Sequence, residues 1–134
     1  MELVILIVML ALIQYIVFAA QVGNARVKYG VKAPAVSGHP VFERRLRVQM
    51  NTLEQLIIFI PALVSYAWLA DSLEWYGSEI AAFLGVIYLI GRQLYARAYQ
   101  QDPQKRSVGF MLSFMPSAFL IIGALVCVLL TVIR

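Results

Sequence analysis

Four long apolar stretches constrain the fold of this chain more than any other feature. They cover positions 3–20, 56–70, 80–91 and 107–133. A membrane-spanning helix needs ~20 apolar residues, so the first and fourth stretches are about long enough alone. The second and third reach that length only if the helices extend into the polar residues beside them. The pattern predicts four transmembrane helices.

The composition leads to the same prediction. Of the 134 residues, 62% are hydrophobic and 13% are charged, whereas soluble domains carry about 25% charged residues. We expect an all-α integral membrane protein in which residues 1–134 form one four-helix transmembrane bundle. We interpret positions 3–20 as a retained helix rather than a signal peptide, because the stretch lacks a basic leading segment and a small-residue cleavage site.

The basic residues are concentrated in two of the three connections between the apolar stretches. Of the 11 Lys and Arg residues, six lie between positions 26 and 47, four between 92 and 106, and one is Arg134. The link between the second and third stretches carries three acidic residues and no basic one. By the positive-inside rule, we expect the first and third connections in the cytoplasm and both termini on the opposite side.

The chain shows no pattern typical of a metal site or an internal disulfide. Its one cysteine, Cys127, lies in the fourth apolar stretch, and its one histidine is His39. A zinc or disulfide framework needs several such residues. We interpret Cys127 as a packing residue, and we expect no metal and no nucleic-acid partner.

A stripe of polar residues opens the second predicted helix. Arg47, Asn51 and Glu54 follow one another at spacings of four and three, which places them on one helical face. A full span that ends near position 70 takes Asn51 and Glu54 to the depth or the edge of the membrane. Polar groups at that depth face protein rather than lipid.

A second polar group closes the third predicted helix. Arg92, Tyr95 and Tyr99 again share one face, and Arg106 follows shortly after. The topology gathers the polar residues of both groups, with neighbours from the first and second helices, at one end of the bundle: Arg26, Arg47, Gln49, Asn51, Glu54, Arg92, Tyr95, Tyr99 and Arg106. These cations, amides, phenols and one acid suit a small zwitterion with several carboxylates.

Many of the polar residues in the predicted helices also have a structural interpretation that involves no ligand. Arg47 and Glu54 can pair with each other or with Arg92, which is a common fate of charges in membranes. The tyrosines can belong to an interfacial aromatic belt, and arginines such as Arg44 and Arg106 can be ordinary positive-inside charges. Gln14, deep in the first stretch, is expected to bond a neighbouring helix.

The polar motifs resemble those of the MAPEG family, the membrane-associated proteins in eicosanoid and glutathione metabolism. The segment FERRLRVQMNTLEQL, positions 42–56, resembles the family signature of an Arg, an Asn four residues on and a Glu three further. The segments YLIGRQLYARAYQQDPQKR (88–106) and QVGNARVKYG (21–30) are similar to the corresponding segments of the leukotriene-forming branch. The correspondence extends over nearly the whole chain.

The resemblance implies a homotrimer of four-helix subunits that holds glutathione between neighbouring subunits. The glutathione-binding residues it implies are Arg47, Asn51, Glu54, Tyr95 and Tyr99 of one subunit, with Arg26 and Gln49 of the next. Glu54 would receive the γ-glutamyl amine and the arginines the carboxylates. Arg106 would lie beside the sulfur as the catalytic residue. A free thiol titrates near ~8.5, only the thiolate attacks, and an adjacent guanidinium lowers the thiol pKa.

The implied function is that of a membrane-bound glutathione S-transferase with glutathione as co-substrate. Its second substrate would be a hydrophobic or lipid-derived electrophile that arrives from the bilayer along an intersubunit groove lined by the first and fourth helices, and peroxidase activity is a further expectation. Gln55 stands where the leukotriene-forming branch has Tyr, and Val27 stands where it has a second Arg. We therefore expect a broad transferase rather than leukotriene synthesis.

Two other classes of protein remain as alternatives. One is a non-catalytic lipid-binding member of the same family, and the other is a small membrane transporter. A pure lipid binder has no use for the polar cluster that includes Arg47, Glu54 and Arg106. A transporter needs a polar path to the other side, yet only Gln14 and scattered Ser and Thr residues lie deeper in the predicted membrane segments.

Overall fold

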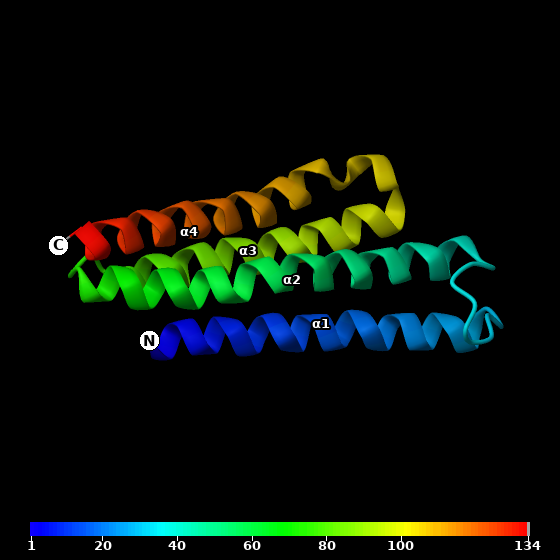
Figure 1. The fold of residues 1–134 in the computed structure, drawn as a ribbon. Coiled ribbons are helices and arrows are strands. Elements are labelled where there is room, and N and C mark those ends of the chain that lie inside the picture. The colour runs from blue at the N-terminus through cyan, green and yellow to red at the C-terminus, as the bar shows by residue number, and fades with distance from the viewer. Residues whose placement is uncertain (134) are drawn as a thin grey trace.

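The computed structural model describes residues 1–133 and is built from helices that run side by side (Figure 1). In chain order they are α1 (Glu2–Lys28), α2 (Pro40–Ser72), α3 (Gly77–Gln101), the 3-10 helix η1 (Pro103–Arg106) and α4 (Ser107–Ile133). The N-terminus, the α2–α3 turn and the end of α4 lie at one end of the bundle, and the other two connections lie at the opposite end (Figure 1). Arg134, one of the basic residues counted above, lies outside the described residues.

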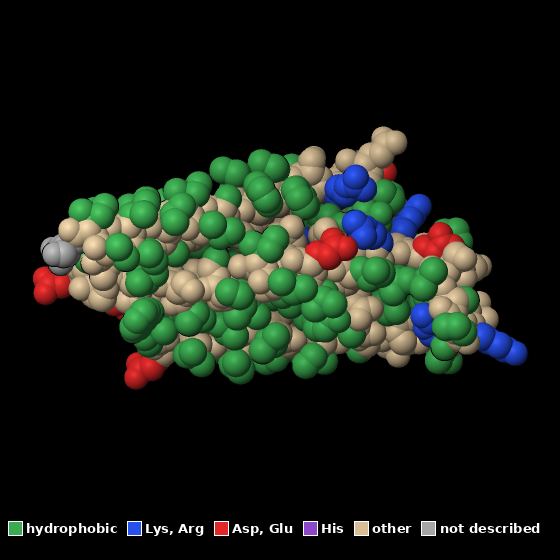
Figure 2. Space-filling model, in the orientation of Figure 1, with side chains coloured by type: hydrophobic (Ala, Val, Ile, Leu, Met, Phe, Trp, Pro, Cys, Tyr) green, Lys and Arg blue, Asp and Glu red, His purple; other side chains and the backbone are tan. Residues whose placement is uncertain are grey.

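All four long helices have the length and hydropathy to cross a membrane. As predicted, α2 and α3 reach that length by including polar residues, since α2 begins at Pro40 and α3 ends at Gln101. Hydrophobic side chains cover most of the visible face, and the Lys and Arg side chains gather at the end with the α1–α2 and α3–α4 connections (Figure 2). The predicted all-α, four-helix membrane class is confirmed.

Helices α2 and α3 form the middle of the bundle, and α1 and α4 lie on either side of them (Figure 1). Phe59 of α2 stacks on Tyr88 of α3 with ring centroids 3.7 Å apart. Gln14 of α1 donates to the Leu89 carbonyl oxygen of α3 at 3.1 Å, which confirms its predicted bond to a neighbouring helix. Cys127 is 1% exposed, so its interpretation as a packing residue is confirmed.

Helices α3 and α4 approach each other closely where small residues meet. A Cβ atom added at Gly91 would lie 2.7 Å from the backbone nitrogen of Ser113, and one added at Gly109 would lie 2.6 Å from the Cα of Tyr95. Neither position has room for a methyl group, and small residues allow this kind of approach between membrane helices. The short separation brings Ser113 of α4 within reach of side chains on α3.

Candidate functional site

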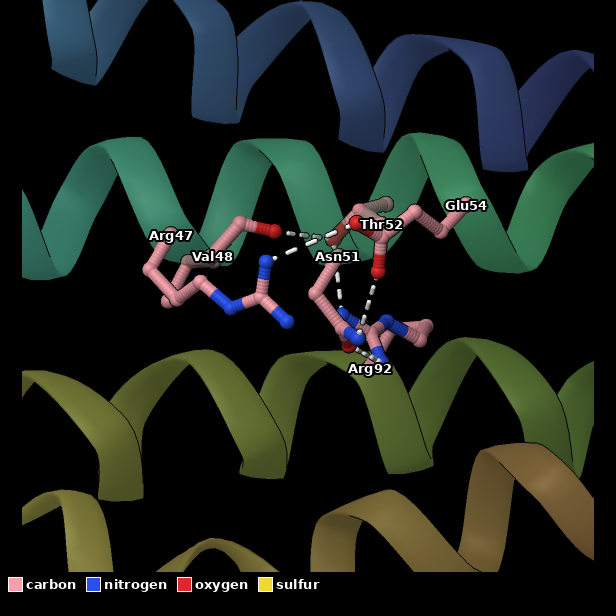
Figure 3. A network of polar contacts seen from close by, with 6 residues as sticks. All are labelled: Arg47, Val48, Asn51, Thr52, Glu54 and Arg92. Atoms are coloured by element: carbon pink, nitrogen blue, oxygen red, sulfur yellow. Dashed lines mark hydrogen bonds and ion pairs between the residues drawn. The ribbon is translucent and has the colours of Figure 1, made fainter. Parts of the chain in front are cut away.

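The polar stripe of α2 forms a connected cluster (Figure 3). The Nη1 of Arg47 lies 3.5 Å from the Oε1 of Glu54, and their side chains are 49% and 53% exposed. The Nδ2 of Asn51 donates to the other carboxylate oxygen of Glu54 at 3.3 Å. The alternative that Arg47 and Glu54 pair with each other is therefore confirmed. An ion pair this exposed contributes only about 0–1 kcal/mol, so a charged ligand can replace it at little cost.

Arg92 of α3 reaches toward the face of α2 that carries Asn51 and Thr52 (Figure 3). Its Nη1 donates to the Oδ1 of Asn51 at 3.0 Å, and its Nη2 donates to the Oγ1 of Thr52 at 2.8 Å. A longer bond of 3.4 Å joins Nη1 to the Oγ of Ser113 on α4. The side chain is fully buried, and within residues 1–133 no carboxylate lies at ion-pair distance from it. Arg92 thus bonds an amide and two hydroxyls rather than Glu54.

The two tyrosines of α3 and Arg106 of η1 lie beside this cluster. The ring centroids of Tyr95 and Tyr99 are 5.5 Å apart. The guanidinium carbon of Arg92 lies 4.3 Å from the centroid of Tyr95, and that of the exposed Arg106 lies 5.6 Å from the centroid of Tyr99. The structure thus brings together the following predicted residues: Arg47, Asn51, Glu54, Tyr95, Tyr99 and Arg106.

The connection between α3 and α4, which includes Arg106, is stabilised by side-chain hydrogen bonds to backbone groups. Arg44 of α2 donates from Nη1 to the carbonyl oxygens of Gln100 and Gln101, at 3.0 and 3.2 Å. Because the last carbonyls of a helix have no partner within the helix, these bonds cap the end of α3. Asp102 then accepts from the backbone N–H of Gln104 at 3.0 Å and caps η1. Arg44 therefore has a structural role that its charge alone did not predict.

Arg26 and Gln49 lie apart from this cluster within one chain. The Nη1 of Arg26 donates to the carbonyl oxygen of Ala35 at 2.8 Å, and its guanidinium lies 4.6 Å from the Phe42 ring centroid. The Nε2 of Gln49 donates to the hydroxyl of Tyr15 on α1 at 3.2 Å. Gln49 is two residues from Arg47, and positions two apart face different sides of a helix. A role for Arg26 and Gln49 in a neighbouring subunit stays a prediction.

Thr52 and Ser113, whose hydroxyls bond Arg92, are not among the residues predicted from the sequence. Thr52 directly follows Asn51, and its hydroxyl also donates to the Val48 carbonyl oxygen at 2.7 Å. Ser113 follows Gly109 by four residues, so the two share a face of α4. A face of small and hydroxyl residues is typical of close helix packing in membranes, and this pattern was the available signal.

An apolar groove lies between α3 and α4, deeper in the membrane part of the bundle. Its volume is about 340 Å³, and its walls include Leu84, Ile87, Met115 and Phe119. Among residues 1–133 there is no group of three or more His, Cys, Asp or Glu side chains that could hold a metal ion.

Residues 4–126 match the MAPEG family. The chain is 48% identical to an uncharacterized protein of Synechocystis sp. over 124 residues, which are 92% of this chain and 86% of that protein. It is 44% identical to microsomal glutathione S-transferase 2 of Homo sapiens over 110 residues, which are 81% of this chain and 70% of the relative. It is 34% identical to leukotriene C4 synthase of Bos taurus over 89 residues, which are 66% of this chain and 55% of the relative.

Proposed function

Since the chain belongs to the MAPEG family and is an integral membrane protein, we propose that it is a membrane-bound glutathione S-transferase. The observation that carries the proposal is the convergence of Arg47, Asn51, Glu54 and Arg106 with two tyrosines at one end of the bundle. The similarity to a microsomal glutathione S-transferase supports it. A protein that only holds lipid has no need of this polar cluster.

The charges of the cluster complement those of glutathione. The exposed carboxylate of Glu54 receives the γ-glutamyl ammonium group, and the guanidinium of Arg47 receives a carboxylate. When glutathione binds, the exposed Arg47–Glu54 ion pair would be replaced by two ion pairs with the ligand, one at Glu54 and one at Arg47. The rings of Tyr95 and Tyr99 offer a flat wall beside these charges.

Arg106 acts on the sulfur. Its guanidinium is exposed and stays charged, so it stabilises the glutathione thiolate and lowers the pKa of the thiol. The thiol proton passes to solvent. The thiolate then forms a sulfur–carbon bond with the electrophile, and the electron pair of the broken bond leaves with the displaced group or remains on the opened ring oxygen.

We place the complete site between subunits of a homotrimer. Arg26 and Gln49 bond within their own chain and away from the cluster. In this proposal a neighbouring copy supplies both residues, as the family resemblance implies. The hydrophobic or lipid-derived electrophile arrives from the bilayer along apolar surfaces between subunits. By the distribution of basic residues the site faces the cytoplasm, and the termini face the other side.

Glutathione binding and conjugation by the detergent-purified protein test this function. The expected result is saturable glutathione binding in titration calorimetry, with conjugate formed from members of a panel of hydrophobic electrophiles. The panel includes an organic hydroperoxide, which two glutathione molecules reduce to an alcohol and water while forming glutathione disulfide. Protein that remains folded, binds no glutathione and forms no product would contradict the proposal.

A further inference from the structure

We propose that Arg92 is a positioning residue, which orients the side-chain amide of Asn51 so that the site offers an N–H donor. The inference rests on the proposed glutathione function, because Asn51 is one of the proposed binding residues. Arg92 itself is fully buried. It therefore acts on a ligand only through the side chains that it holds.

The hydrogen-bonding chemistry of the two side chains decides the orientation of the amide. A guanidinium has donors and no acceptor, whereas an amide has an oxygen on one side and an NH2 group on the other. The 3.0 Å bond from Arg92 Nη1 therefore requires the Asn51 oxygen. The Nδ2 group then faces the Glu54 carboxylate, at 3.3 Å from Oε2. If the Asn51 amide were reversed, its NH2 group would face the N–H donors of Arg92. Its oxygen would then face the carboxylate oxygens of Glu54.

Arg92 is held firmly enough to impose this choice. Thr52 accepts from its Nη2, Ser113 accepts from its Nη1, and its guanidinium carbon lies over the Tyr95 ring, 4.3 Å from the centroid. Partners therefore come from α2, α3 and α4. Close packing at Gly91 keeps α4 near enough for Ser113 to take part. With contacts from three helices, the Arg92 guanidinium has little freedom to move away from Asn51.

The consequence is a selection rule for the ligand. Asn51 has two N–H groups, of which Glu54 takes one. Asn51 as a whole residue is 8% exposed, and the group that its amide offers a ligand is the second N–H. A ligand atom at Asn51 must then be an acceptor, whereas the group at Glu54 must be a donor. An ammonium group with a carboxylate beside it, as in the α-amino acid end of a γ-glutamyl peptide, meets both requirements.

The first test compares Arg92→Met with two matched controls, Thr52→Val and Ser113→Ala. All three remove bonds of the buried guanidinium, but only Arg92→Met frees the Asn51 oxygen. Loss of a charge-assisted hydrogen bond predicts a glutathione dissociation constant raised about tenfold in Arg92→Met, with turnover at saturating glutathione nearly unchanged. Thr52→Val and Ser113→Ala each loosen Arg92 but keep its bond to Asn51, so both should lower the melting temperature and raise the dissociation constant less than Arg92→Met does, by about threefold or less.

A double-mutant cycle separates positioning from general loosening of the fold. If Arg92 acts through Asn51, Arg92→Met should change glutathione affinity by less than about twofold in an Asn51→Ala background. If the two substitutions instead raise the glutathione dissociation constant by independent factors that multiply in the double variant, the positioning role is overturned. The proposed transferase function would not be affected by that result. A wild-type protein that fails to bind glutathione would overturn both.

Asn51→Asp keeps the inference testable where Arg92→Met does not fold. The aspartate still accepts from Arg92 but has no N–H to offer. Affinity for glutathione should fall by at least about tenfold. Wild-type affinity in folded Asn51→Asp protein would show that the donor is not needed and would refute the inference.

Discussion

At the scale of single residues, the arginines of this chain have different tasks that their common charge conceals. Arg92 is buried and bonds polar groups from two other helices. Arg44 caps the end of α3. Arg47 is half exposed beside Glu54, and Arg106 is exposed over Tyr99. Of these four arginines, Arg47 and Arg106 are the exposed ones, so the two should separate binding from chemistry.

We expect Arg106→Ala to lower turnover while glutathione still binds, and Arg47→Ala, the matched control, mainly to raise the Michaelis constant. If Arg106 lowers the thiol pKa by about one unit, its loss removes ~1.4 kcal/mol of thiolate stabilisation. The thiolate then forms only at higher pH, so the pH profile of conjugation shifts upward. Ultraviolet difference spectra of the glutathione complex measure the thiolate directly. Equal thiolate signals and equal pH profiles in wild type and Arg106→Ala would show that Arg106 is only a positive-inside charge with no catalytic role.

At the scale of the helices, the packing of α3 against α4 determines whether the site forms. Tyr95 and Arg92 belong to α3, while Gly109 and Ser113 belong to α4. The contact between Arg92 and Ser113 spans 3.4 Å, so a small increase in helix separation breaks it. The two helices meet at Gly91 and Gly109. The small size of these residues sets the distance between α3 and α4.

Gly109→Ala should destabilise the protein by about 1–3 kcal/mol, because the added methyl overlaps the backbone of Tyr95. Glutathione affinity should fall with it, since Tyr95 moves. Gly23→Ala in α1 is the matched control, because a Cβ atom there meets nothing within 4 Å and alanine favours the helix. Thermal unfolding in detergent measures both variants. Equal melting temperatures for the two would contradict the packing described for α3 and α4.

At the scale of the whole molecule, the bundle has one basic end and apolar flanks. Large hydrophobic side chains remain exposed along α1 and α4, among them Ile16, Phe114 and Ile122. Such surfaces face lipid or another subunit in a membrane protein. The polar cluster lies at the end with the α1–α2 and α3–α4 connections (Figure 2), and this placement leads to predictions on assembly and on orientation.

We expect a homotrimer in mild detergent, measured by native mass spectrometry, with sites shared between subunits. Arg26→Ala would damage the site of a neighbour, and Arg47→Ala would damage the site of its own chain. Oligomers mixed from these two variants should therefore regain activity that each variant lacks alone, because some sites then combine an intact Arg47 with an intact Arg26. A monomer that binds glutathione as tightly as the native assembly would refute the shared site.

Cysteine labelling of intact cells or sealed vesicles should find opposite sides for the two ends of the bundle. Val36→Cys in the α1–α2 loop and Trp75→Cys in the α2–α3 turn replace exposed side chains, while the native Cys127 is buried. The basic loops predict position 36 on the cytoplasmic side and position 75 on the other. The reverse labelling pattern would show that the orientation is inverted.

Features that depend on residues close together in the chain could be predicted without the fold. Long apolar stretches predict helices because a backbone in lipid must satisfy its hydrogen bonds internally. Arg47, Asn51 and Glu54 share a face because their spacing follows the helical period, and their ion pair and hydrogen bond are local contacts within α2. The grouping of Tyr95 and Tyr99 follows from the same rule.

The contacts between side chains of different helices, in contrast, could be read only from the folded bundle. The sequence placed Arg92 near the polar cluster but left open an ion pair with Glu54, whereas the fold joins Arg92 to Asn51, Thr52 and Ser113. These contacts depend on the distance and rotation of α2, α3 and α4. Packing at residues such as Gly91 sets that geometry, and helical periodicity within one segment contains no information about it.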